Sequence, residues 1–150
     1  MKWVFPVIIL LGCSGAVVLN HSNIREIIKA DAGAVSAGGR YPSAVLDTEG
    51  RKNGFYFALD SEGRILFHPN PILIGSKFDK SDFIKEIINR RSGCLGYDFM
   101  GKKHLIFFEP VNDEDILCFS IPASSVSGNG GTCSPITQKK GAQNEEKGRN

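Results

Sequence analysis

Cys13 carries the most sharply defined chemistry in the sequence. It follows Leu10-Leu11-Gly12, at the end of an apolar run that a positively charged start precedes. A small residue before a cysteine, with a leucine three positions upstream, is typical of a lipoprotein signal peptidase site. The cysteine thiol at such a site takes up a diacylglycerol. We therefore predict that residues 1–12 are a lipoprotein-type signal peptide and that Cys13 is the lipid anchor.

Two alternatives stay open for this N-terminal segment. Trp3–Leu19 contains seventeen uncharged residues, which is at the lower edge of a membrane-spanning helix, so it could be an uncleaved signal anchor. Cleavage after the small residues Ser14-Gly15-Ala16 would instead release a secreted protein. All three interpretations place the rest of the chain outside the cytoplasm, and we expect a membrane-anchored protein of the periplasm or cell surface.

Three further cysteines fit an oxidising compartment. Cys94 and Cys118 both fall in predicted strands and are the candidates for a disulfide, which would leave Cys133 free in a flexible tail. The alternative is that Cys94 and Cys118 are small buried hydrophobic residues, a common role of cysteine. No pair of cysteines has the spacing of a zinc site, and no haem-attachment motif occurs. We predict no metal and no cofactor.

Several polar residues could hold a small ligand. His68 stands at the end of a predicted strand, where it could donate to a ligand carboxylate or pin the turn before Pro69 by bonding a backbone carbonyl. Tyr56 alternates with Phe55 and Phe57, and its phenol suits the lining of a cavity better than a core. Secondary candidates for ligand binding are Tyr97 and Lys103.

Composition and motifs disfavour other classes of function. The formal net charge is only +2, with basic and acidic residues interspersed, so nothing indicates a nucleic-acid partner. The chain has no Gly-x-Ser-x-Gly elbow, no phosphate-binding glycine loop and no His/Cys/Asp metal cluster. The acidic loop at Asp113–Asp115 is ordinarily a hydrated connection between strands. We therefore predict that the protein is not an enzyme and has no catalytic residues.

The pattern of apolar residues predicts the elements that position these groups. A helix is predicted over Asn20–Lys29, with Asn20 or Ser22 as its cap, in a helical segment over residues 20–40. Residues 30–39 either continue this helix weakly or form a spacer. A second helix begins at Ser81 or Asp82. The strands are predicted at residues 55–59, 64–68, 94–100, 103–110 and 116–121. This predicts an α+β fold, a five-stranded antiparallel sheet with the N-terminal helix and one helix between the second and third strands.

Residues 123–150 differ in composition from the rest of the chain. They are rich in glycine and serine, carry mixed charge and contain no aromatic residue. Such a segment buries too little apolar surface to order itself. We predict a disordered polar tail here, with no second membrane span after Ile121.

The segment from Gly54 to Asn70 carries a resemblance to a known family. Its aromatic strand runs into Leu59-Asp60-Ser61-Glu62-Gly63, and the next strand ends in His68-Pro69. Ile74-Gly75-Ser76-Lys77 follows. This series resembles the signature of single Cache domains, and the similarity covers residues 41–122. The resemblance implies a PAS-like sheet and an extracytoplasmic domain that senses small molecules.

Such domains hold organic acids or amino acids in a pocket between the sheet and its covering segments. Arg40-Tyr41 looks similar to the Arg-Tyr that leads into the first strand in the family, with a plain linker as the alternative. The resemblance therefore implies a membrane-tethered ligand-binding protein without its own output domain, which presents its ligand to a separate membrane receptor. The rival hypothesis is a structural or interaction protein of the cell envelope that has no ligand pocket.

Overall fold

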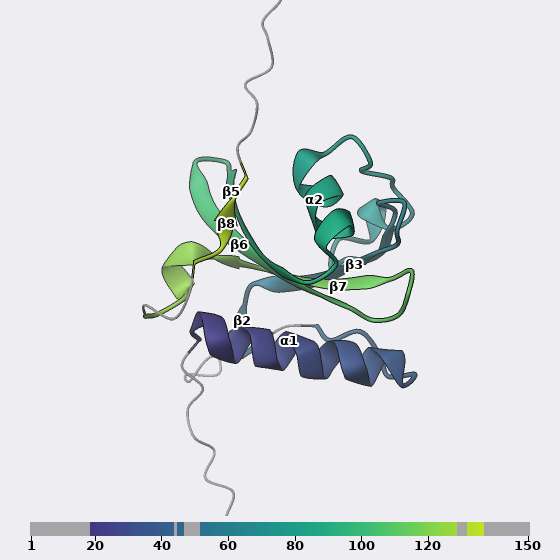
Figure 1. Cartoon of the computed structure of the whole chain (residues 1–150), viewed down its shortest axis with the longest axis horizontal. Coiled ribbons are helices and arrows are strands. Elements are labelled where there is room, and N and C mark those ends of the chain that lie inside the picture. The colour runs from purple at the N-terminus through teal and green to yellow at the C-terminus, as the bar shows by residue number, and fades with distance from the viewer. Residues whose placement is uncertain (1–18, 44, 47–51, 129–131, 137–150) are drawn as a thin grey trace, which may run out of the picture.

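One twisted sheet with a helix on each face forms the body of the protein (Figure 1). The computed structural model describes residues 19–43, 45–46, 52–128 and 132–136. Helix α1 (His21–Ser36) lies against β6 and β7, and helix α2 (Asp82–Arg90) lies on the opposite face. The predicted α+β class is confirmed.

The sheet has six strands in the order β4-β3-β7-β6-β5-β8. Its strands are β3 (Phe55–Leu59), β4 (Ile65–Phe67), β5 (Gly93–Phe99), β6 (Lys102–Pro110), β7 (Ile116–Pro122) and β8 (Ser134–Pro135). The first five are the predicted strands, and they pair antiparallel with their neighbours. The short strand β8 pairs parallel with β5, so the sheet is mixed and the prediction of a five-stranded, purely antiparallel sheet was wrong.

Smaller elements complete the described part of the chain. A two-stranded ladder joins β1 (Val45–Leu46) to β2 (Lys52–Asn53). Two 3-10 turns follow strands of the sheet: η1 (Pro71–Leu73) after β4 and η2 (Ala123–Ser125) after β7. None of the described helices is long and apolar enough to cross a membrane.

Helix α1 begins where the sequence predicts. The Asn20 side chain accepts a hydrogen bond from the Asn23 N–H at 2.9 Å, which satisfies one of the free donors of the first turn. The helix continues past Lys29 to Ser36, because Ala32 extends the buried row of Ile24 and Ile28 along the same face.

Side chains of the central strands point alternately to the two faces of the sheet, and so form two separate cores. On β7, Leu117, Phe119 and Ile121 pack with α1, whereas Ile116 and Cys118 belong to the core under α2. The same alternation assigns Phe107 to the first core and Phe108 to the second. Because helices cover both faces, all of β7 except its last residue is buried.

The predicted Cys94–Cys118 disulfide was wrong. Cys94 forms a disulfide with Cys133, with 4.8 Å between the two Cα atoms. Cys118 is a buried free thiol on the opposite face of the sheet, and β6 separates its strand from that of Cys94. Burial raises the pKa of the Cys118 thiol, so this cysteine has the role of a small hydrophobic residue.

The predicted disordered tail is partly ordered. Residues 123–128 turn back against the start of α1, where the Ser127 N–H donates to the Leu19 carbonyl at 2.8 Å. Residues 132–136 run beside β5, held by the Cys133 disulfide and the pairing of β8. The disulfide and the pairing with β5 thus order residues 132–136, although their composition alone predicts disorder. The predicted signal peptide, Cys13 and residues 137–150 lie outside the described residues.

Shortening a buried side chain of α1 should show how much the packing of this helix contributes to the stability of the protein. Ile28 is fully buried in the α1 core, so Ile28→Ala is expected to lower the free energy of unfolding by about 2–5 kcal/mol. Ile72, which is 83% exposed, provides the matched control, and Ile72→Ala should change that energy by less than about 0.5 kcal/mol. Urea unfolding measures both values. Equal effects of the two substitutions would contradict the packing of α1 on the sheet.

Candidate functional site

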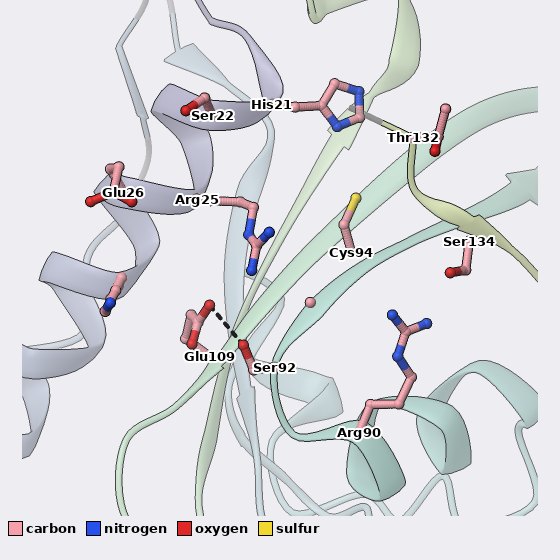
Figure 2. A pocket seen from close by; sticks show the side chains of 12 residues that line it. His21, Ser22, Arg25, Glu26, Arg90, Ser92, Cys94, Glu109, Thr132 and Ser134 are labelled. Atoms are coloured by element: carbon pink, nitrogen blue, oxygen red, sulfur yellow. Dashed lines mark hydrogen bonds between the residues drawn. The ribbon is translucent and has the colours of Figure 1, made fainter. Parts of the chain in front are cut away.

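A polar cleft of about 630 Å³ lies at the edge of the sheet where β5 begins (Figure 2). We call it the edge cleft. Its walls come from the first turns of α1, the end of α2, β6 and the segment that leads into β8. Its lining residues are His21, Ser22, Arg25, Glu26, Lys29, Arg90, Ser92, Gly93, Cys94, Glu109, Thr132 and Ser134.

Cations from two helices meet at the edge cleft. Figure 2 shows Arg25 of α1 and Arg90 of α2 extending toward it from different sides. Lys29, one turn after Arg25, adds a third cation. Two carboxylates, Glu26 and Glu109, also line the cleft, so its side chains carry a small positive excess.

Two of the three cations have no partner in the described part of the chain. No hydrogen bond or ion pair with a described residue engages the side chain of Arg25 or Lys29. The Arg90 guanidinium lies 3.8 Å from a Glu86 carboxylate oxygen, in a solvent-exposed i,i+4 pair of modest strength. The positive end of α1 also points to this region, because the helix begins at His21. The local field therefore favours a negatively charged group.

Glu109 is held in place by its neighbour. The Ser92 hydroxyl donates a hydrogen bond to the Glu109 carboxylate at 2.9 Å, and both residues are half-buried. This contact leaves further acceptor capacity on the carboxylate. The edge cleft therefore offers guanidinium donors for a carboxylate and a fixed carboxylate that could accept from an ammonium group.

The structure places Tyr56 in the core and not at the cleft. Its ring is fully buried under α1, and its hydroxyl donates a hydrogen bond to Asp31 of α1 at 2.5 Å. Burial, followed by this hydrogen bond and the negative charge of Asp31, raises the pKa of Tyr56 well above the ordinary tyrosine value. The phenol thus joins the helix to the sheet.

His68 shapes the turn that follows β4. Its Nδ1 accepts a hydrogen bond from the Asn70 N–H at 2.9 Å, where the turn interpretation expected a bond to a carbonyl. The ring lies edge-on to Phe55, with 5.4 Å between centroids. Burial lowers the pKa of His68, so the neutral imidazole is favoured.

The other predicted ligand residues lie apart from one another. Tyr97 stacks on Phe83 under α2, and its hydroxyl shares a 3.0 Å hydrogen bond with that of Ser120. Tyr41 stacks on Phe67 with 4.9 Å between centroids. The remaining two, Lys103 and Arg40, are exposed.

None of the six predicted ligand residues lines the edge cleft, and the structure does not bring the six together. Their role in binding stays a prediction.

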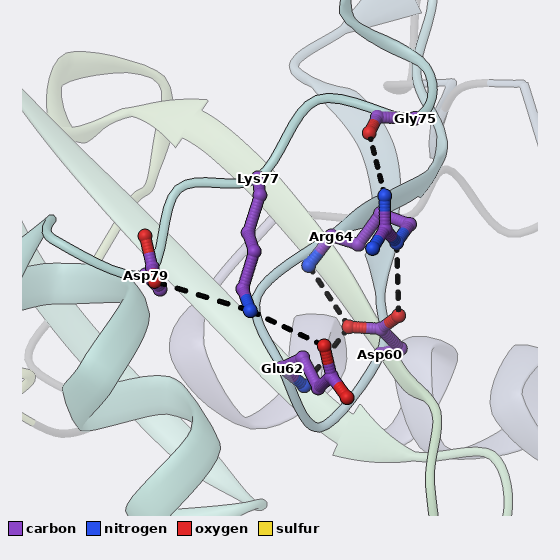
Figure 3. Close-up of polar contacts among 6 residues, drawn as sticks. All are labelled: Asp60, Glu62, Arg64, Gly75, Lys77 and Asp79. Atoms are coloured by element: carbon purple, nitrogen blue, oxygen red, sulfur yellow. Dashed lines mark hydrogen bonds and ion pairs between the residues drawn. The ribbon is translucent and has the colours of Figure 1, made fainter.

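The Leu-Asp-x-x-Gly turn has a structural role in this chain (Figure 3). The Asp60 carboxylate accepts from the backbone N–H groups of Glu62 and Arg64, each at 2.9 Å. The Arg64 side chain donates to the Gly75 carbonyl at 3.2 Å, and Lys77 lies 3.2 Å from a Glu62 carboxylate oxygen. These contacts attach the loop before α2 to the β3–β4 hairpin, and thereby position α2 on the sheet.

Sequence reasoning missed the residues of the edge cleft. A signal existed on α1, because Ser22, Arg25 and Lys29 recur at helical spacing on its polar side. A polar helix face is ordinarily just solvated, however. This face of α1 becomes a wall of the edge cleft only because Arg90 and Ser92 lie opposite it. The order of the strands brings these two residues to the cleft from far along the chain.

Comparison with known proteins gives only partial likenesses. No protein-family model matches the sequence, and no curated protein matches it either. Among solved structures, the ligand-binding domain of Mlp24 with asparagine matches at 23% identity and a TM-score of 0.39, covering 48% of this chain and 29% of that one.

The ligand-binding domain of the Pseudomonas aeruginosa PAO1 amino acid chemoreceptor PctB matches in two complexes. The complex with L-Arg gives 18% identity and a TM-score of 0.36, over 48% of this chain and 32% of that one. The complex with L-Gln gives 19% identity and a TM-score of 0.38, over 55% of this chain and 34% of that one. These three structures are thus ligand-binding domains, and this chain covers about a third of the length of each.

The Tyr56–Asp31 hydrogen bond can be tested by substitution. Tyr56→Phe keeps the ring but removes the donor, and should lower the free energy of unfolding at neutral pH by about 1.5–3 kcal/mol. Tyr41→Phe is the control, because no hydrogen bond engages the Tyr41 hydroxyl within the described residues.

The pH dependence of stability gives a second readout of the same bond. The pKa of Tyr56 is higher in the folded than in the unfolded protein, where it is about 10. The contribution of Tyr56 to the free energy of unfolding is therefore complete below about pH 10 and is lost as the pH rises above that value. Between about pH 9 and 11, wild-type stability should therefore decline more steeply than that of Tyr56→Phe. Parallel profiles, measured by urea unfolding, would rule out the buried phenol as the cause.

Proposed function

We propose that this protein binds a small carboxylate-bearing metabolite in the edge cleft and acts as an extracytoplasmic sensor or binding protein. The observation that carries the proposal is the meeting of Arg25 and Arg90, from two helices on opposite faces of the sheet, at one cleft. A guanidinium group binds a carboxylate through two parallel hydrogen bonds, which gives orientation as well as affinity.

The volume and the charge of the cleft favour a small polar ligand. A cleft of about 630 Å³ falls in the range that small-molecule sites occupy. Its lining is charged and hydroxylated, so it suits a hydrophilic metabolite better than a lipid. Glu109 supplies an acceptor for an ammonium group, and this supports amino acids, beside organic acids, as the class to be tested.

A ligand screen with paired variants tests this function. Amino acids and organic acids should be screened by thermal shift, and each hit measured by calorimetry. Arg25→Gln and Arg90→Gln should each weaken binding by roughly 10–100-fold, which corresponds to the loss of one charge-assisted hydrogen-bonded pair. Both side chains are exposed, so the variants should retain the wild-type melting temperature without ligand.

Matched charge variants locate the site. Lys103→Gln and Arg40→Gln remove exposed cations outside the cleft and should leave the affinity unchanged. If these two weaken binding while Arg25→Gln does not, the ligand occupies the residues predicted from sequence and the edge-cleft proposal fails. If no compound raises the melting temperature, the rival hypothesis of an envelope interaction protein is favoured.

We also propose that the protein is attached to a membrane through a lipid on Cys13 and presents its ligand to a separate membrane receptor. The Leu10-Leu11-Gly12-Cys13 series supports the first part. Mass spectrometry of the mature protein from a bacterial host should find an N-terminal diacylated cysteine, and Cys13→Ser should move the protein from the membrane fraction to the soluble fraction. An intact Met1, or an unmodified N-terminus after residue 16, would contradict lipidation.

A further inference from the structure

Three metal-binding side chains meet beside the edge cleft. His21 is the first residue of α1, Cys94 lies in β5, and Cys133 precedes β8. A ring nitrogen of His21 and the two Sγ atoms all lie within 4.8 Å of one another. All three side chains are half-buried. The fold thus brings together one imidazole and the two sulfurs of a disulfide from three distant parts of the sequence.

The spacing of these atoms suits a tetrahedral metal ion. Zinc binds cysteine sulfur at about 2.3 Å and histidine nitrogen at about 2.0–2.1 Å, so two such ligands at a tetrahedral angle lie about 3.6 Å apart. The Cys133 Sγ lies 3.7 Å from the His21 Nδ1. The two sulfurs, which are bonded to each other in the disulfide, would have to separate. The Cys94 Sγ, which lies within 4.8 Å of the imidazole nitrogen, would also have to settle at the ligand spacing.

The surroundings provide orientation and access. The His21 ring packs edge-on against Phe107, with 5.5 Å between centroids, which restrains the imidazole. His21 and Cys94 both line the edge cleft, so an ion could enter from solvent and keep a water on that side. Two sulfurs, one nitrogen and an open fourth position make a donor set for Zn²⁺ and other borderline or soft ions, not for Mg²⁺ or Ca²⁺.

We propose that His21, Cys94 and Cys133 form a Zn²⁺ site when the disulfide is reduced. Reduction by a dithiol adds two electrons and two protons to the Cys94–Cys133 bond, gives two thiols and converts the dithiol to its own disulfide. Zn²⁺ then displaces both thiol protons and binds two thiolates and the neutral imidazole. In the oxidised protein the sulfurs are bonded to each other, so the disulfide and the metal exclude one another.

This site does not depend on the proposed metabolite function, although it shares a wall with the edge cleft. In either state the three side chains join α1, β5 and the segment before β8. The oxidation state therefore decides whether this junction is a covalent bond or a metal centre. A metabolite screen and a metal titration report on the two proposals separately.

Cobalt provides a direct probe of the site. The full chain with Cys13→Ser, which removes a competing thiol, is prepared in oxidised and reduced form and titrated with Co²⁺. The reduced protein should bind one Co²⁺ per chain, with thiolate charge-transfer absorption and the visible bands of a tetrahedral ion. The oxidised protein should show neither. Excess Zn²⁺ should bleach the cobalt spectrum and raise the melting temperature of the reduced protein.

Substitutions then identify the ligands. In the same background, Cys94→Ser and Cys133→Ser should each abolish the charge-transfer band, and His21→Gln should weaken Co²⁺ binding at least tenfold. His68→Gln and Cys118→Ala are the controls and should bind as the parent does, since neither residue belongs to the cluster. A reduced chain that unfolds without metal and refolds with Zn²⁺ would also support the site, provided that His21→Gln impairs the refolding.

Two results would overturn the proposal. One is the absence of a charge-transfer band in the reduced parent protein, whether folded or unfolded. The other is a band of equal strength and affinity in His21→Gln, since the imidazole would then not be a ligand and the cysteines would bind metal without the fold.

Discussion

The single sheet of this protein must bury both of its faces, and the placement of the helices follows from that requirement. The central strand β7 sends alternate side chains into two cores, and neither core is closed without its helix. Helix α1 closes one core with a row of isoleucines, and α2 closes the other with Ile84 and Ile87. Each helix must therefore keep a fixed rotation about its axis, and its polar side is fixed as a consequence.

The position of the edge cleft follows from this packing. Because the two faces are occupied by apolar side chains and helices, charged groups can converge only at a margin of the sheet. At the β5 margin, the start of α1, the end of α2 and the segment before β8 approach one another. Cations that would be separately solvated on isolated helices here share one cleft, with Glu109 among them.

The same packing explains why several residues that were predicted to bind a ligand have structural roles instead. Tyr56 lies under α1, so its hydroxyl is used to bind Asp31, and Tyr97 lies under α2 beside Ser120. His68 holds the turn after β4 through its Nδ1. At the β5 margin, by contrast, the Cys94–Cys133 junction joins a segment of low apolar content to the sheet, and it lies directly beside the cleft.

Local sequence patterns were sufficient to predict the individual helices, strands and turns. These elements depend on residues close together in the sequence, so the spacing of apolar residues and the residue types of turns reveal them. They include the Asn20 cap, the isoleucine stripes of both helices, the Asp60–Gly63 turn and the five main strands. The three-dimensional packing was needed to show which face α1 covers, which cysteine bonds to Cys94, and that β8 joins the sheet. Each of these depends on strand order and on contacts between distant segments, which local patterns do not encode. The edge cleft belongs to this second group, because its walls come from residues 21–29, 90–94, 109 and 132–134 and meet only when the sheet is complete.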